Sequence, residues 1–70
     1  MCNEATVERL RKEYPIGTRV ELLEMDDRFA LPIGTKGTVR GVDDVGHLLM
    51  IWDNGSTLNV IPGVDEVRKL

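Results

Sequence analysis

The chain has 70 residues, of which 41% are hydrophobic and 30% charged, and its nine basic and twelve acidic residues give a net charge of −3. This length allows one domain, residues 1–70, whose apolar content excludes a disordered tail and whose charge excludes polyanion binding through bulk attraction. The sequence contains neither the roughly 20 consecutive apolar residues of a membrane-spanning helix nor a signal-peptide segment.

The N-terminal segment predicts a helix over residues 1–13. Asn3 is a suitable N-cap, and Val7, Leu10 and Tyr14 recur at a spacing of three and four residues, which gives one narrow apolar stripe. The proline after Tyr14 ends the helix, because the residue before a proline disfavours helical backbone angles. A helix this short is marginal alone in water, so we expect the stripe to pack against the rest of the chain.

From residue 15 onward the pattern changes to short strands and tight turns, and we expect a barrel over residues 15–70. Alternation of polar and apolar residues predicts four strands, Arg19–Leu22, Thr38–Val42, His47–Trp52 and Thr57–Ile61. Asn54-Gly55 predicts a hairpin between the last two, because both residues tolerate positive φ. The final segment, Val64–Leu70, is either a short 3₁₀ turn or a closing strand.

A short motif, Pro15-Ile16-Gly17-Thr18, recurs seventeen residues later as Pro32-Ile33-Gly34-Thr35. We interpret both copies as turns in which proline fixes φ and glycine supplies a positive φ. One long loop after the first strand, followed by strands joined by tight turns, predicts a mostly β fold. The expected architecture is a small antiparallel SH3-like barrel of about five strands with a short N-terminal helix.

Trp52 is predicted to anchor the core, because one large ring fills much of so small an interior. Leu48 and Met50 alternate with it on the same face of their strand. The apolar residues expected across from this face are Val20, Leu22, Val39, Leu58 and Val60.

Residues that carry catalysis or bind metals are sparse. His47 is the only histidine and Cys2 the only cysteine, so neither a zinc site nor a nucleophile–base pair has partners at a suitable spacing. Asp26-Asp27 and Asp43-Asp44 do not extend into a calcium loop, and we interpret them as carboxylates that bond to local backbone. We therefore expect no enzymatic activity, no cofactor and no metal. The single cysteine also excludes an internal disulfide and favours a cytoplasmic location.

The segment Met25–Leu31 is the longest connection expected between strands, and it is the strongest candidate site. Binding residues concentrate on loops that a rigid scaffold positions. An aromatic ring beside an arginine is also a combination enriched at interface hot spots. We predict that Asp26, Asp27, Arg28 and Phe29 bind a protein partner, whose identity the sequence does not reveal.

Two alternatives remain open. In the first, Met25, Phe29 and Leu31 fold back and cap one end of the barrel, because a small core needs every apolar residue it can bury. In the second, the domain is a nucleic-acid-binding accessory module, although acidic residues interleave with its basic ones. The arginines that would contact nucleic acid are Arg19, Arg40 and Arg68.

Seven short motifs spread over residues 14–70 together form a specific combination. They are Tyr14-Pro15, Gly17-Thr18-Arg19-Val20, Met25-Asp26-Asp27, Gly34-Thr35-Lys36-Gly37-Thr38-Val39, Val42-Asp43-Asp44, Trp52-Asp53-Asn54-Gly55-Ser56 and Ile61-Pro62-Gly63. This combination resembles the bacterial domain-of-unknown-function family numbered 4314. The resemblance implies a short bacterial protein, often from conjugative elements or phages of Gram-positive bacteria, and it brings no established activity.

Overall fold

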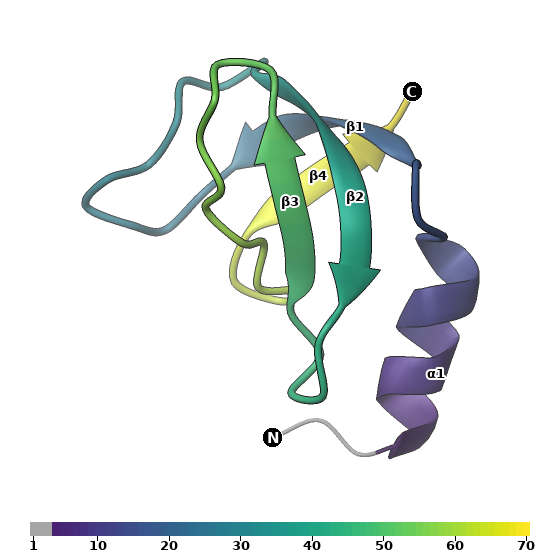
Figure 1. The fold of residues 1–70 in the computed structure, drawn as a ribbon. Helices are drawn as coiled ribbons and strands as arrows, with labels where there is room; N and C mark the ends of the chain where they lie inside the picture. The colour runs from purple at the N-terminus through teal and green to yellow at the C-terminus, as the bar shows by residue number, and fades with distance from the viewer. Residues whose placement is uncertain (1–3) are drawn as a thin grey trace.

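The computed structural model describes residues 4–70, which form one helix and four strands (Figure 1). Their bounds are Glu4–Glu13 for α1, Arg19–Glu24 for β1, Lys36–Val42 for β2, Leu48–Trp52 for β3 and Glu66–Lys69 for β4. The predicted helix is confirmed over its described residues, 4–13, and the first three predicted strands are confirmed. The segment after Val64 is the closing strand. The predicted cap Asn3 and the cysteine Cys2 lie outside the described residues. No helix within residues 4–70 is long and apolar enough to cross a membrane.

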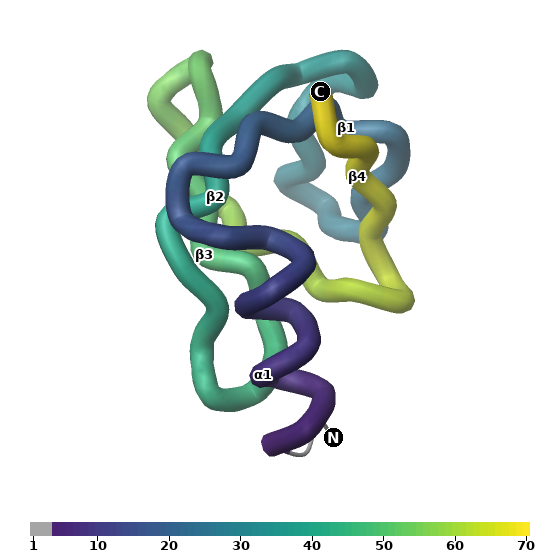
Figure 2. Tube along the Cα trace, turned by 90° about the vertical axis from the view of Figure 1, so that its right-hand side faces the viewer, coloured from purple at the N-terminus to yellow at the C-terminus, as the bar shows by residue number. Residues whose placement is uncertain are grey.

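The four strands form one antiparallel sheet in the order β3-β2-β1-β4. Strands β1, β2 and β3 follow one another in both chain and space, whereas β4 returns to pair with β1. Figure 2 shows the result, with β4 at the margin of the molecule away from β2 and β3. The expected mostly β fold with one short helix is confirmed, and the sheet itself does not close.

The prediction of a strand over Thr57–Ile61 is wrong, because only Val60 pairs, in an isolated antiparallel bridge with Leu48. The backbone groups of Leu58 form hydrogen bonds with side chains instead. Its carbonyl accepts a hydrogen bond from Trp52 Nε1 at 2.7 Å, and its N–H donates to Ser56 Oγ at 3.2 Å. A residue bonded in this way cannot also join a strand ladder, so regular pairing stops after the hairpin turn.

The core is one cluster, and its largest buried side chain is Trp52, with only 1% of its surface exposed. The prediction that this residue anchors the interior is confirmed. Gly37 lies directly opposite Trp52 in the β2–β3 register, and its missing side chain leaves room for the indole ring. The remaining fully buried large residues come from the predicted faces, and they are Leu22, Leu48, Met50, Val20, Val39 and Val60. Leu58, expected among them, is only half-buried.

Helix α1 packs against the lower end of the sheet beside β2 (Figure 1). Its stripe residues Val7 and Leu10 are both 5% exposed and join the core cluster, as the sequence predicts. Arg11 adds a polar attachment, because its Nη2 donates to the Val42 carbonyl at 3.1 Å. The helix therefore closes an end of the core that the sheet leaves uncovered.

The two Pro-Ile-Gly-Thr motifs adopt the same turn. In each, the threonine N–H and hydroxyl both bond to the proline carbonyl, with the hydroxyl distance 2.6 Å from Thr18 and from Thr35. Gly17 and Gly34 have φ values of 95° and 94°, which only glycine adopts at low cost. The interpretation of both motifs as turns is confirmed, and each turn leads into a strand of the sheet.

Candidate functional site

The connection from β1 to β2 contains the predicted partner-binding loop, and it projects from the sheet on the side away from α1 (Figure 1). Met25 and Leu31, at the two ends of the loop, are half-buried and pack against the core. Phe29 between them has 69% of its surface exposed. The capping alternative therefore holds for Met25 and Leu31 and is wrong for Phe29.

At the tip of this loop, the Arg28 guanidinium carbon lies 5.2 Å from the centroid of the Phe29 ring, within cation–π range. The Asp27 carboxylate accepts a hydrogen bond from the Phe29 N–H at 2.7 Å, and the Ala30 N–H donates to the Asp27 carbonyl at 3.0 Å. This local turn presents the ring and the guanidinium together. Asp26, Asp27, Arg28 and Phe29 are all exposed, so the structure brings the four predicted residues into one surface group.

The buried carboxylate of Asp65, which the sequence pattern did not reveal, forms a hydrogen bond with the backbone at the base of the loop. Asp65 is 6% exposed, and its two carboxylate oxygens accept hydrogen bonds from the Asp26 and Ile61 N–H groups, each at 2.9 Å. The first bond ties the loop to the segment that precedes β4. Asp65 stands in the string Val64-Asp65-Glu66-Val67, where nothing in the spacing marks it as buried. Two N–H donors compensate for the loss of its hydration.

The arginines predicted for nucleic-acid binding lie on three neighbouring strands, and two of them are already paired with carboxylates. Arg19 binds Asp53 through two hydrogen bonds of 2.7 Å. This bonding raises the pKa of Arg19 and lowers the pKa of Asp53. Arg68 forms an ion pair with Glu21 on β1. Arg40 is exposed on β2, so the three do not form a continuous basic stripe.

Asp43 and His47, also considered as possible catalytic or metal-binding residues, lie in a turn that is held by local hydrogen bonds. The Asp43 carboxylate accepts hydrogen bonds from the Val45 and His47 N–H groups, at 3.1 and 2.8 Å, as expected for a turn carboxylate. The His47 ring nitrogen Nδ1 lies 3.9 Å from the same carboxylate. Within residues 4–70, no three His, Cys, Asp or Glu side chains are grouped so as to hold a metal ion.

A family model described as "Domain of unknown function (DUF4314)" matches residues 3–70. The resemblance inferred for residues 14–70 is confirmed, and the match extends through the helix to residue 3. No curated protein and no solved structure matches the chain.

Proposed function

This chain belongs to the DUF4314 family, and we propose that it is a non-enzymatic interaction module that binds a protein partner through the Met25–Leu31 loop. The observation that carries the proposal is the state of Phe29, which is 69% exposed although both ends of its loop are half-buried against the core. The contact group consists of Asp26, Asp27, Arg28 and Phe29. We expect the partner to offer an apolar pocket for the ring, with polar groups of both signs around it.

Burial of the Phe29 ring would supply about 1–2 kcal/mol, since about two-thirds of a side chain worth about 1.5–3 kcal/mol is still exposed. The Arg28 guanidinium beside the ring adds the second side chain that is typical of an interface hot spot. The loop is also largely ordered before binding, because the carboxylates of Asp65 and Asp27 accept hydrogen bonds from the backbone at its base and at its tip. A preorganised loop loses less conformational entropy on binding, which favours affinity.

The proposal includes the SH3-like architecture expected from the sequence. The bridge from Val60 to Leu48 extends the strand order beyond β3, so that paired segments run from Val60 through β3, β2 and β1 to β4. A register shift between Val39 and Gly41 gives β2 the local irregularity that accompanies strong strand bending. Both features support a curled sheet of the small-barrel type.

The origin and location of the protein are also part of the proposal. The family resemblance supports a bacterial protein of mobile-element or phage origin. A single cysteine in 70 residues supports a reducing compartment, the cytoplasm, because no internal disulfide contributes to stability. The absence of enzymatic activity is proposed on the residue types alone, since His47 lacks a nucleophile and Ser56 lies in a hairpin turn.

Capture from a lysate of the native host, read by mass spectrometry, tests the proposed site when four variants are compared with the wild type. Phe29→Ala and Arg28→Glu should each lose a protein that the wild type retains. The matched controls are Ile16→Ala, which truncates an 80% exposed side chain in another turn, and Arg9→Glu on the exposed side of α1. All four should melt within about 5 °C of the wild type, since exposed substitutions cost little.

Two outcomes contradict the proposal. In one, the controls lose the captured protein to the same extent as the loop variants. In the other, Phe29→Ala unfolds the domain while Arg28→Glu keeps the protein, which makes the loop part of the core. The nucleic-acid alternative has less support, because Arg19 and Arg68 already pair with carboxylates. Tight binding to DNA or RNA that weakens steeply with salt would favour that alternative.

A further inference from the structure

Strand β4 lies at the edge of the sheet, and one of its sides is unpaired. The Leu70 N–H donates to the Arg19 carbonyl of β1 at 3.0 Å. Because bonded and non-bonded pairs alternate in an antiparallel ladder, the backbone groups of Arg68 and Leu70 face β1, and those of Val67 and Lys69 face away. This edge can therefore pair with another strand.

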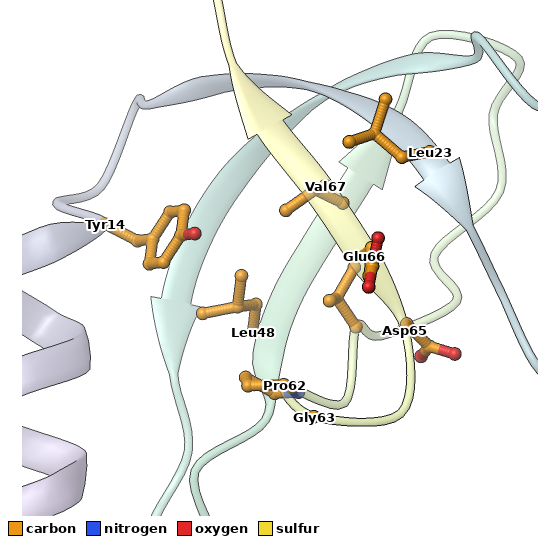
Figure 3. A pocket seen from close by; sticks show the side chains of 9 residues that line it. Tyr14, Leu23, Leu48, Pro62, Gly63, Asp65, Glu66 and Val67 are labelled. Carbon is orange, nitrogen blue, oxygen red and sulfur yellow. The ribbon is translucent and has the colours of Figure 1, made fainter.

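A hollow of about 240 Å³ lies beside the same strand (Figure 3). Its lining is mainly apolar and includes Tyr14, Leu48, Val60, Pro62 and Val67. In Figure 3 the Val67 side chain extends from β4 toward Leu48 and Tyr14. When a strand is added to a sheet edge, side chains of the new strand enter such pockets and select which strand can bind.

The charges on β4 indicate what this edge accepts. Glu66 lies directly opposite Glu24 on β1, and both side chains are exposed. Like charges in this arrangement destabilise a strand pair. Within residues 4–70, neither carboxylate has an ion-pair or hydrogen-bond partner. A positive side chain placed on the free side of Glu66 would relieve the repulsion.

We propose that the occupant of this edge is a second copy of the chain, paired antiparallel through β4. Only Val67 and Lys69 present backbone groups at the free edge. In the dimer, each of them must therefore lie opposite Val67 or Lys69 of the second copy. One register places Val67 opposite the partner's Val67 and Glu66 opposite the partner's Arg68. The other registers place Arg68 or Lys69 opposite its own copy, which sets like charges against each other. The charge pattern therefore selects a single register.

The selected register is symmetric, so each favourable contact occurs twice. Arg68 already pairs with Glu21 of its own chain, and the partner's Glu66 would extend this pair to a group of three charges. The two Val67 side chains would meet beside the apolar hollow. Four residues from each chain make a small interface, so we expect a weak dimer, populated at about 0.1–1 mM protein. Such a dimer carries two Phe29 loops, which goes beyond the proposed function and would strengthen binding to a repetitive partner.

Sedimentation equilibrium on the full chain tests the dimer, with the monomer mass at 7.9 kDa. The informative variants are Glu66→Lys and Glu24→Lys, which make the same charge change on the two members of one like-charge pair. Both remove the repulsion within the monomer, but only Glu66→Lys sets a positive charge against the partner's Arg68. We expect Glu66→Lys to weaken dimerisation about thirtyfold and Glu24→Lys to change it by about threefold at most. Thermal melting of both variants confirms that they fold.

A mixing experiment tests the register itself. Glu66→Lys and Arg68→Glu should each fail to self-associate, because each sets like charges in contact, whereas a mixture of the two should form the heterodimer. A dilution series of the wild type gives a readout that needs no variant, in which the amide resonances of Val67 and Lys69 should shift most. A wild type that is monomeric at about 1 mM overturns the proposal. So does a dimer that Glu66→Lys and Glu24→Lys weaken equally.

Discussion

A methyl group added at position 37 would collide with the indole ring of Trp52. The Cβ of an alanine in place of Gly37 would lie 2.6 Å from Trp52 Cε3, 3.0 Å from Cδ2 and 3.1 Å from the Ile51 carbonyl oxygen. The carbonyl belongs to the β3 backbone and cannot move alone. The ring is 1% exposed and its Nε1 is bonded to the Leu58 carbonyl, so it also has little freedom to retreat. Gly37→Ala must therefore strain both β3 and the core.

Overpacking of this kind costs about 1–3 kcal/mol, and we expect Gly37→Ala to lie near the middle of that range. A chain of 70 residues has a total unfolding free energy of about 4–10 kcal/mol. Each kcal/mol corresponds to about 4–8 °C in a domain of this size, so the melting temperature should fall by about 10 °C. The loss is large enough to measure and small enough to leave a folded protein.

Thermal melts followed by circular dichroism would test this reasoning in the wild-type background and in the Trp52→Phe background. The phenyl ring has no atom at the position of Cε3, the closest contact, whereas the contact with the Ile51 carbonyl oxygen remains. Gly37→Ala should therefore cost about 1 kcal/mol less there than in the wild-type background. Gly63→Ala is a matched control, because that glycine has a φ of 90° and open space around it. Its cost should be the same in both backgrounds. An equal cost of Gly37→Ala in the two backgrounds would refute the steric explanation.

Three further predictions concern Asp65, Trp52 and Asp53. Asp65→Ala leaves two backbone N–H groups without acceptors and should lower the unfolding free energy in urea by about 2–4 kcal/mol, whereas a loss below about 1 kcal/mol would show that water replaces the carboxylate. Trp52→Ala should cost about 3–5 kcal/mol, and an unchanged melting temperature would place the ring outside the core. The hydrogen bonds from Arg19 lower the pKa of Asp53, so the stability that this carboxylate supplies is complete above its ordinary pKa of 3.8 and is lost as the pH falls through the lower folded value. The difference in melting temperature between the wild type and Asp53→Asn should therefore vanish in strong acid, and a difference that is constant with pH would contradict this.

Local patterns in the sequence predict much of the fold because they depend on neighbouring residues. The proline and glycine of the two Pro-Ile-Gly-Thr motifs specify turns wherever they occur. The alternation around Trp52 likewise identifies the buried face of β3. The segment around Leu58 shows where this reasoning fails. Its alternation is that of a strand, but its backbone groups bond to Trp52 and Ser56, and a period-two pattern carries no information about such bonds.

The candidate site depends more heavily on contacts distant in the sequence. Composition marks the Met25–Leu31 loop as unusual, but only the folded chain shows that its ends are half-buried against the core while Phe29 is exposed. Asp65 acts on the loop from 39 positions away along the chain. The pairing of Arg68 with Glu21 requires the β1–β4 register, which no local pattern specifies. These features could not be predicted without the tertiary structure.

The most direct test of the proposed function is the dissociation constant of the captured partner protein for three forms of the domain. By titration calorimetry, Phe29→Ala should weaken binding by about tenfold or more, whereas Ile16→Ala should leave the affinity unchanged. The wild-type affinity should also fall much less steeply with salt than phosphate binding does, because the ring supplies an apolar contact. Equal affinity of the wild type and Phe29→Ala for the partner would contradict the assignment of this loop as the binding site.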